Sequence, residues 1–413
     1  MKRRTTIVAA LGAALALALS GCADGANGND PDPSDSALTG PIEVWVMGNK
    51  GPAMEAVAAG FTQETGVAVQ VQAIPWGDVR TKMSTAIASG EGPDVLQVGL
   101  DRVAEWADAG GLLDLTDRIA AYPELKAETF FPASASTMTY DGRVMTVPWI
   151  ADTRVLFYRS DLLEEVGLSG PPTSWAEWSA AAQALSQRGP GQYGMGFNVN
   201  DVNTPLILTW SAGGDIESAG QLSFTSSQYR QAVEFEHSFF ADGLTPARAL
   251  ADADLIAGFK DGSIPMFISG PYMTRNLADQ APELKGQWSV APIPAQQSST
   301  SLMAGSNLGV FAFSKHIPAA LAFISYLDQR DIQLAWNSTT FDLPAVQGAL
   351  ELLTGDAAVA VYHQQMGSAK PVPITADWGA VAQEITRATE QINLGGVAID
   401  QALAELEAQV EAL

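Results

Sequence analysis

The sequence predicts an α/β protein with a largely parallel sheet, and three observations support this. First, a β-rich run at 42–47 is followed by a stretch with helical spacing at 53–64 and a second strand-like run at 67–73. Second, the alternation repeats at once, with helical spacing at 78–89 and a short apolar strand at 94–98. Strands that alternate with helices form βαβ units, in which the strands are parallel. Third, about 390 residues follow the N-terminal leader, enough chain for two lobes with sizeable cores.

Two loops are the expected place for a ligand. In open α/β sheets, ligands bind beyond the carboxyl ends of the strands. The loops at 48–52 and 99–102 follow the first and third predicted strands, so we expect binding residues in both. The C-terminal stretch 378–413 has helical spacing that is interrupted near Gly395.

The N-terminus has the features of a bacterial export signal. Residues 2–4 are Lys-Arg-Arg, and residues 7–19 form an apolar run that is short for a membrane span. The run ends in Leu-Ser-Gly-Cys at 19–22, which resembles a lipobox. We therefore predict a signal peptide at 1–21 and lipidation of Cys22; an ordinary signal peptide with an incidental cysteine is the alternative.

The segment after Cys22 is expected to be a flexible tether. Residues 22–40 are rich in Gly, Asn, Asp, Pro and Ser and offer little apolar surface to bury. Cys22 is the only cysteine, so no disulfide can form within one chain. These features predict an extracytoplasmic protein that is held at the cell membrane by its lipid anchor alone.

Charge and motifs exclude several classes of function. The net charge of −24 argues against a surface that binds nucleic acid or anionic lipid. The three histidines lack metal-type spacing, which argues against a zinc site. The chain has no G-x-S-x-G elbow, no P-loop and no complete dinucleotide fingerprint, so we expect no cofactor and no catalytic activity.

Several short segments resemble the family 1 extracellular solute-binding proteins of ABC importers, the sugar-binding group that includes maltose-binding protein. The resemblance runs from about 42 to 413, nearly the whole mature chain. Each segment is weak alone, but their order and spacing together are specific. They are VWVMGNKG at 44–51, FTQETGV at 61–67, ASGEGPDV at 88–95, GGLLDL at 110–115, YRSDLL at 158–163, FKDG at 259–262 and ISGPY at 268–272.

This resemblance implies a periplasmic-binding-protein-like fold of type II, with two α/β lobes, a hinge and a ligand cleft between them. It places lobe 1 at 41–151 plus 296–340 and lobe 2 at 152–295 plus 341–413. It implies a monomer that delivers an oligosaccharide to two transmembrane permease subunits. Because the chain lacks a P-loop, the transport ATPase must be a separate chain.

The same resemblance implies polar ligand residues in the first lobe. Asn49 and Lys50 stand where maltose-type proteins carry an Asp-Lys pair, and Asn keeps an acceptor while adding a donor. Asp101 and Arg102 match a ligand-binding Asp-Arg pair. The alternative for each is a loop cap or a surface ion pair.

Further polar positions lie where the chain enters the second lobe. Asp152 takes the place of a sugar-binding Glu, and the alternative is a salt bridge with Arg154. Asp201 and Asn203 stand where the maltose-type proteins have a Glu and a stacking Tyr. Asn203 cannot stack on a sugar, so one subsite is expected to differ.

Aromatic side chains are expected to stack on the C–H faces of sugar rings. Tyr272 and Trp378 match stacking positions, with core packing as the alternative. Trp149 is either a cleft aromatic or a hinge packing residue. The weaker candidates are Trp210 and Trp336, which core packing also explains, and Trp76 with Asp78, which line the cleft unless Asp78 caps the following helix.

The predicted function is therefore capture and delivery of an oligosaccharide. One alternative keeps the fold but changes the ligand to a polyol, a glycerophosphodiester or another polar solute. A more distant alternative is a lipid-anchored glycoside hydrolase in which Asp101 and Asp152 act as acid and base.

Overall fold

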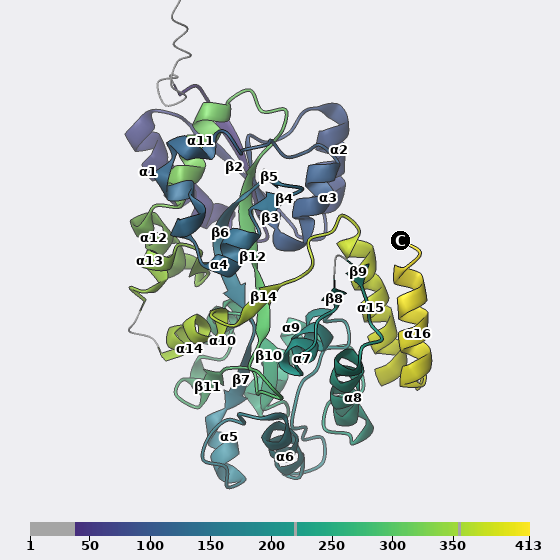
Figure 1. Ribbon diagram of the computed structural model, residues 1–413. Coiled ribbons are helices and arrows are strands. Elements are labelled where there is room, and N and C mark those ends of the chain that lie inside the picture. Colours follow the sequence, from purple (N-terminus) through teal and green to yellow (C-terminus); the bar gives the residue numbers. More distant parts are fainter. Residues whose placement is uncertain (1–37, 219–220, 354–356) are drawn as a thin grey trace, which may run out of the picture. The chain divides into compact units, whose positions relative to one another are not determined.

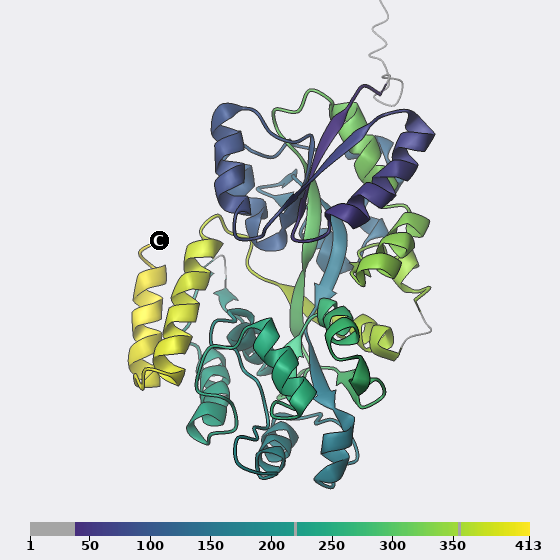
Figure 2. The same ribbon diagram turned by 180° about the vertical axis from the view of Figure 1, so that it is seen from behind.

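The described part of the chain folds around a larger and a smaller β-sheet, and the chain passes directly from one to the other after β6 (Figures 1 and 2). The computed structural model describes residues 38–413 except 219–220 and 354–356. The predicted signal peptide, Cys22 and most of the predicted tether lie outside the described residues.

Helices and short strands surround the two sheets. The helices are α1 (Gly51–Thr65), α2 (Val79–Ser89), α3 (Val103–Asp108), α4 (Pro132–Ser136), α5 (Ser160–Glu165), α6 (Trp175–Ser186), α7 (Asn203–Ser211), α8 (Ser227–Ala241), α9 (Asp252–Asp261), α10 (Tyr272–Gln280), α11 (Ile317–Leu327), α12 (Arg330–Thr340), α13 (Gln347–Leu350), α14 (Ala357–Met366), α15 (Trp378–Asn393) and α16 (Ile399–Val410). Two small hairpins pair β4 (Thr139–Tyr140) with β5 (Arg143–Val144), and β8 (Glu217–Ser218) with β9 (Gln221–Leu222). Among the described residues, none of these helices is long and apolar enough to cross a membrane.

The larger sheet has the strand order β13-β6-β12-β3-β1-β2, and β14 also pairs with β12. Its strands are β1 (Ile42–Met47), β2 (Val69–Ile74), β3 (Val95–Gly99), β6 (Val147–Thr153), β12 (Ser301–Val310), β13 (Leu343–Pro344) and β14 (Ala369–Pro371). The first three strands are parallel, as the βαβ pattern predicts. The sheet as a whole is mixed, however, because β12 pairs antiparallel with both β3 and β6. The expectation of a largely parallel sheet was therefore wrong beyond β3: it extended a local pattern to strands that are far apart in the sequence.

The smaller sheet is antiparallel and has the order β10-β7-β11. It consists of β7 (Val155–Arg159), β10 (Met266–Ser269) and β11 (Trp288–Ala291). A single residue, Arg154, separates β6 in the larger sheet from β7 in the smaller one. Ser301, the first residue of β12, donates from its Oγ to the carbonyl of Arg154 at 2.7 Å. The chain thus passes between the sheets once after β6, at Arg154, and a second time between β11 and β12. The hydrogen bond from Ser301 shows that the two crossings lie next to each other.

Large apolar side chains fill the core around each sheet. The core beside the smaller sheet is aromatic, and the rings of Trp178 and Phe197 lie 5.7 Å apart between their centroids. Phe197 and Phe239 make an edge contact at 5.1 Å. Because such pairs bury large apolar areas, they stabilise the lobe without the help of a disulfide.

Candidate functional site

The candidate site begins at the carboxyl ends of β1 and β3. These strands are parallel neighbours, with Val44 opposite Val95, so the loops that follow them lie at the same edge of the sheet, as predicted. Gly48 turns the chain directly after β1 with a φ of 72°, a left-handed conformation that favours glycine.

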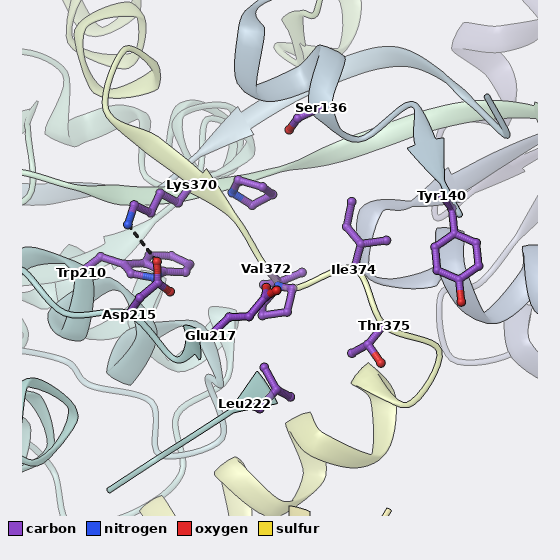
Figure 3. Close-up of a pocket in the computed structure, with 12 residues that line it drawn as sticks. Ser136, Tyr140, Trp210, Asp215, Glu217, Leu222, Lys370, Val372, Ile374 and Thr375 are labelled. Carbon is purple, nitrogen blue, oxygen red and sulfur yellow. Dashed lines mark hydrogen bonds and ion pairs between the residues drawn. The ribbon is translucent and has the colours of Figure 1, made fainter. Parts of the chain in front are cut away.

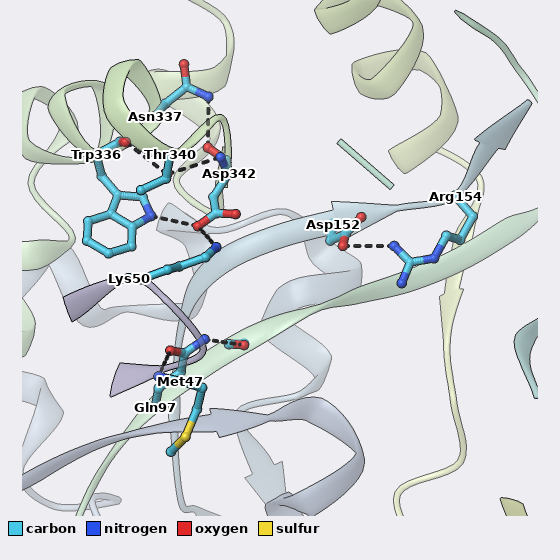
Figure 4. Close-up of polar contacts among 10 residues, drawn as sticks. Met47, Lys50, Gln97, Asp152, Arg154, Trp336, Asn337, Thr340 and Asp342 are labelled. Carbon is cyan, nitrogen blue, oxygen red and sulfur yellow. Dashed lines mark hydrogen bonds and ion pairs between the residues drawn. The ribbon is translucent and has the colours of Figure 1, made fainter. Parts of the chain in front are cut away.

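A buried glutamine anchors this edge. The Oε1 of Gln97 in β3 accepts from the backbone N–H of Met47 at 2.8 Å, and its Nε2 donates to Ser306 Oγ in β12 at 2.9 Å (Figure 4). The last residue of β1 is thereby tied to two other strands. The loop that carries Asn49 and Lys50 consequently starts from a fixed point.

Trp76 lies beside both loops and is half exposed to solvent. Its side chain is 50% exposed, and its ring atoms would lie 3.4 Å from a Cβ built on Gly48 and 3.5 Å from one built on Gly99. An apolar ring exposed beside two glycines offers a flat face at the sheet edge. Asp78 occupies the N-cap position of α2 but makes no side-chain capping bond, because its backbone is in the αR region rather than extended. The capping role proposed for Asp78 is therefore wrong.

Lys50 forms an ion pair with Asp342 in the turn between α12 and β13 (Figure 4). Trp336 donates from Nε1 to the same Asp342 carboxylate at 3.0 Å. The predicted residue Asn49 is exposed next to this pair. The chain thus brings Lys50 together with an acid almost 300 positions away, which the sequence did not indicate.

Asp101 and Arg102 form the short 3₁₀ turn Leu100–Arg102 that follows β3. Arg102 pairs with Asp101 at 3.2 Å and with Glu105 at 3.1 Å. Glu105 also accepts from Arg80 at 2.7 Å. A Cβ on Gly379, at the start of α15, would lie 3.7 Å from Arg102 Nη1, so α15 begins against this charged turn.

Asp152 and Arg154 form the second polar group, where the chain crosses between the sheets. Arg154 Nη1 donates to Asp152 Oδ2 at 2.9 Å (Figure 4). The guanidinium also lies 5.8 Å from the ring centre of Tyr272. The salt bridge was the alternative reading of Asp152, and the structure confirms it. The other oxygen, Asp152 Oδ1, is buried and has no hydrogen-bond partner among the described residues. Asp152 therefore keeps one acceptor oxygen that no described residue uses.

Burial and neighbouring charges shift the pKa values of this group. Burial raises the pKa of the Asp152 carboxyl, Arg154 opposes the rise, and Asp342 and Lys50 add smaller opposing effects. Burial works against the charged form of Arg154, yet Asp152, Tyr272 and Asp201 together raise its pKa. Burial also raises the pKa of the Tyr272 hydroxyl. These effects mean that Lys50, Asp342, Asp152, Arg154 and Tyr272 form one electrostatic group.

Asp201 and Asn203 lie at the start of α7 and bond chiefly to each other. Asp201 Oδ1 accepts from the backbone N–H of Asn203 at 3.0 Å and from its Nδ2 at 2.8 Å. Asp201 also accepts from Thr204 Oγ1 at 3.3 Å. Both side chains remain partly exposed, but their local bonds already fix the start of this helix.

Most of the predicted tryptophans belong to the core. Trp149 is 1% exposed and packs against Trp336, with ring centres 4.6 Å apart, so the structure assigns it to packing rather than to a ligand face. Trp378 is 3% exposed within an apolar cluster, which corrects its assignment as a stacking platform. Trp210 and Trp336 are also buried, in agreement with their alternative reading. A large apolar ring gains more from burial than from partial exposure, and the sequence alone did not distinguish the two environments.

A cavity of about 770 Å³ lies beside β14 and the residues that follow this strand (Figure 3). Lys370 pairs with Asp215 at 3.0 Å at its rim, and Trp210 Nε1 donates to the same acid at 3.1 Å. Of the residues predicted to bind a ligand, Trp210 is the one that lines it. The lining residues are Ser136, Tyr140, Trp210, Asp215, Glu217, Leu222 and Lys370 to Thr375.

The described residues contain no cluster of His, Cys, Asp or Glu side chains that could hold a metal ion. The site is instead built from ion pairs, the half-exposed indole of Trp76 and the phenol of Tyr272. These groups can bind hydroxyls and apolar faces.

Comparison with known proteins assigns the chain to a family. Residues 46–334 match the family described as bacterial extracellular solute-binding protein. An uncharacterized lipoprotein from the oleD 5′ region of Streptomyces antibioticus is 29% identical over 78% of this chain and 72% of its own length.

Two solved structures are similar over 90% and 89% of this chain. The sugar-binding protein MalE from Xanthomonas citri is 28% identical, with a TM-score of 0.84 and 96% of its chain covered. The GacH receptor of Streptomyces glaucescens, which was solved unliganded and with acarbose, is 25% identical, with a TM-score of 0.79 and 96% of its chain covered. The family match, which covers more than half of the sequence, agrees with the two-lobe α/β fold of these structures. The chain therefore belongs to the bacterial extracellular solute-binding proteins.

Proposed function

We propose that this protein captures a neutral oligosaccharide between its two lobes and delivers it to an ABC importer. The observation that carries the proposal is the half-exposed ring of Trp76 at the edge of the sheet that also bears Lys50 and the Asp101–Arg102 turn. An indole face suits the C–H face of a pyranose ring, and the neighbouring charged groups suit its hydroxyls.

The pairing of charges favours a neutral ligand. Each cation of the site already has a carboxylate partner: Lys50 has Asp342, Arg154 has Asp152, and Arg102 has Asp101 and Glu105. An anionic ligand such as a glycerophosphodiester would have to compete with these carboxylates for the same donors. A sugar hydroxyl can donate to a carboxylate and accept from a cation without breaking the pair.

The similar proteins support a sugar as the ligand class. One solved relative is a sugar-binding protein, and another was crystallised with acarbose. A polyol remains the second candidate within the same fold, and it would use the polar groups without needing Trp76.

The proposed division into lobes follows the crossing strands. The sequence places lobe 1 at 41–151 plus 296–340 and lobe 2 at 152–295 plus 341–413. Because Leu343 and Pro344 pair with Ala151 and Ile150 in the larger sheet, we place the later boundary after β13 rather than at 340. Ligand binding would close the lobes by bending at the crossing beside Arg154.

Delivery requires partners that this chain does not contain. We propose that a monomer docks on two permease subunits that work with a separate ATPase. Cys22 would carry the lipid that keeps the protein at the outer face of the membrane, and the relative named as a lipoprotein supports this. Two acyl chains hold a protein far more firmly than one.

A glycoside hydrolase is the distant alternative. Such an enzyme needs one carboxyl group as an acid and a second as a nucleophile or base. The two candidates, Asp101 and Asp152, each pair with an adjacent arginine. The matched family and the similar solved structures are binding proteins, which favours binding over hydrolysis.

A thermal-shift screen against neutral oligosaccharides, polyols and glycerophosphodiesters tests the proposal. A ligand at ~100 times its Kd stabilises the folded state by about 2.7 kcal/mol, which raises Tm by several degrees. We expect such a shift with at least one neutral oligosaccharide. A shift with glycerophosphodiesters alone would favour the other ligand class.

A further inference from the structure

Asp342 is the buried acid of the site, and its surroundings hold it rigidly. Its side chain is 8% exposed. Its backbone N–H donates to Thr340 Oγ1 at 3.2 Å, and its carbonyl accepts from Asn337 Nδ2 at 2.8 Å (Figure 4). Trp336 Nε1 donates to Oδ2 at 3.0 Å. Side chains from the last two turns of α12 thus fix both the backbone and the carboxylate of Asp342.

The turn before Asp342 explains how the acid comes to face the helix. Phe341 ends α12 with a φ of 62°, which reverses the direction of the chain, and its N–H still donates to the Asn337 carbonyl at 2.8 Å. The Arg275 guanidinium lies 5.5 Å from the centre of the Phe341 ring. Arg275 belongs to α10, the helix that begins at Tyr272. The turn is therefore packed against an element of the second polar group.

Lys50 depends on Asp342 for its orientation. The lysine follows the turn at Gly48, and Asp342 is its one hydrogen-bond acceptor among the described residues. An ammonium has three N–H donors, so two remain for a ligand. A free lysine stem samples many rotamers, and ordering it on binding would reduce affinity.

We propose that Asp342 is a positioning residue of the ligand site: it holds the Lys50 ammonium in place before the ligand arrives, so that the remaining N–H groups meet a ligand hydroxyl without further ordering. This inference rests on the proposed function and adds to it a residue that lies far from the predicted binding loops. Asp342 acts through Lys50, and its own carboxylate stays bonded to Trp336.

A double-mutant cycle tests this role. Asp342→Asn removes the charge and keeps the shape, and Lys50→Met removes the ammonium and keeps most of the stem. Calorimetric Kd values for the best oligosaccharide of the screen should show ~10-fold weaker binding for each single variant. In the Lys50→Met background, Asp342→Asn should change Kd less than about twofold, because the two residues act as a unit. Asp331→Asn, which changes an exposed acid in the first turn of α12, is the matched control and should bind like the wild type.

A second measurement needs no ligand. Limited acetylation followed by mass spectrometry gives the relative reactivity of Lys50 and of the exposed Lys285. Lys50 should react several-fold more slowly than Lys285 in the wild type, and Asp342→Asn should remove most of that difference. If Asp342→Asn does not fold, Asp342→Ser, which also removes the charge and keeps an acceptor for Trp336 Nε1, replaces it in both experiments.

The outcomes separate the two claims. The positioning role is wrong if Asp342→Asn weakens binding equally in the wild-type and the Lys50→Met protein. It is also wrong if Asp342→Asn leaves the acetylation rate of Lys50 unchanged. A wild-type protein that binds no saccharide contradicts the proposed function instead, and the acetylation experiment still decides whether Asp342 holds Lys50.

Discussion

Arg154 Nη1 lies 2.9 Å from Asp152 Oδ2, and Arg154 is itself the single residue at which the chain leaves the larger sheet for the smaller one. The pair therefore lies at the crossing where we propose that the lobes bend. One oxygen of Asp152 is held by Arg154, and the other is buried without a partner. An unsatisfied buried oxygen costs free energy, and we propose that a ligand hydroxyl offsets this cost when the lobes close on it.

Gly270 leaves the space that this pair needs. A Cβ at position 270 would lie 2.2 Å from Arg154 Nη1 and 2.7 Å from Asp152 Oδ1. Gly270→Ala should push the guanidinium away from Asp152 and weaken oligosaccharide binding ~10-fold or more, since hydrogen bonds to charged groups contribute about 1.5–3 kcal/mol. Calorimetry measures the loss. Gly348→Ala, where a Cβ meets nothing within 4 Å, is the control and should bind normally. Unchanged affinity in Gly270→Ala would show that the pair lies outside the ligand site.

Two tryptophans should respond differently to removal. Trp76→Ala should weaken binding by about 1–3 kcal/mol and leave Tm nearly unchanged, because the ring is half exposed. Trp378→Ala should lower the free energy of unfolding by about 3–5 kcal/mol, because the ring is buried in the core.

Melting curves and calorimetry on both variants separate the two roles. Glu217→Ala, on the rim of the cavity beside β14, serves as a control for that location. The assignment fails if Glu217→Ala loses affinity while Trp76→Ala keeps it, since the ligand would then occupy the cavity.

The sequence predicted the local part of this site and missed the long-range part. The loops after β1 and β3 could be placed because parallel neighbours end at one edge, and Asp152 and Arg154 are close in sequence. Asp342 could not be predicted, because its pairing with Lys50 depends on the tertiary structure. The left-handed turn at Phe341, after α12, brings Asp342 next to the loop that follows β1. Trp378 was misplaced, and Trp149 was left between a cleft and a packing role, because an aromatic residue fits a core and a sugar face equally well in sequence.

Glu236 should make stability depend on pH. Its side chain is 2% exposed, and burial, with a contribution from Asp201, raises the pKa of its carboxyl from 4.5 to about 8. The folded state therefore keeps a proton that the unfolded state releases. The resulting stabilisation is complete below pH 4.5 and is lost as the pH rises through 8, on the order of a few kcal/mol.

Replacement by glutamine tests this dependence. Glu236→Gln should flatten the fall of Tm between pH 5 and 9 and should exceed the wild type in stability at pH 9. Glu234→Gln, an exposed acid on the same helix, should follow the wild-type curve. Parallel curves for Glu236→Gln and the wild type would mean that Glu236 does not hold its proton in the folded protein.

The anchor can be tested independently of the ligand. Cys22→Ser should release the protein from the membrane fraction or leave its leader uncleaved, because the thiol that would carry the lipid is gone. Cell fractionation and the mass of the mature N-terminus provide the measurement. Normal processing with undiminished membrane retention would rule out the lipobox.

The most direct test of the central claim is isothermal titration calorimetry of the purified protein with the best neutral oligosaccharide and with an anionic derivative of the same sugar. The account predicts saturable binding of one neutral molecule per chain and at least tenfold weaker binding of the anionic derivative, because every cation of the site already has a carboxylate partner. Tighter binding of the anionic derivative, or no heat with any neutral oligosaccharide, would contradict it.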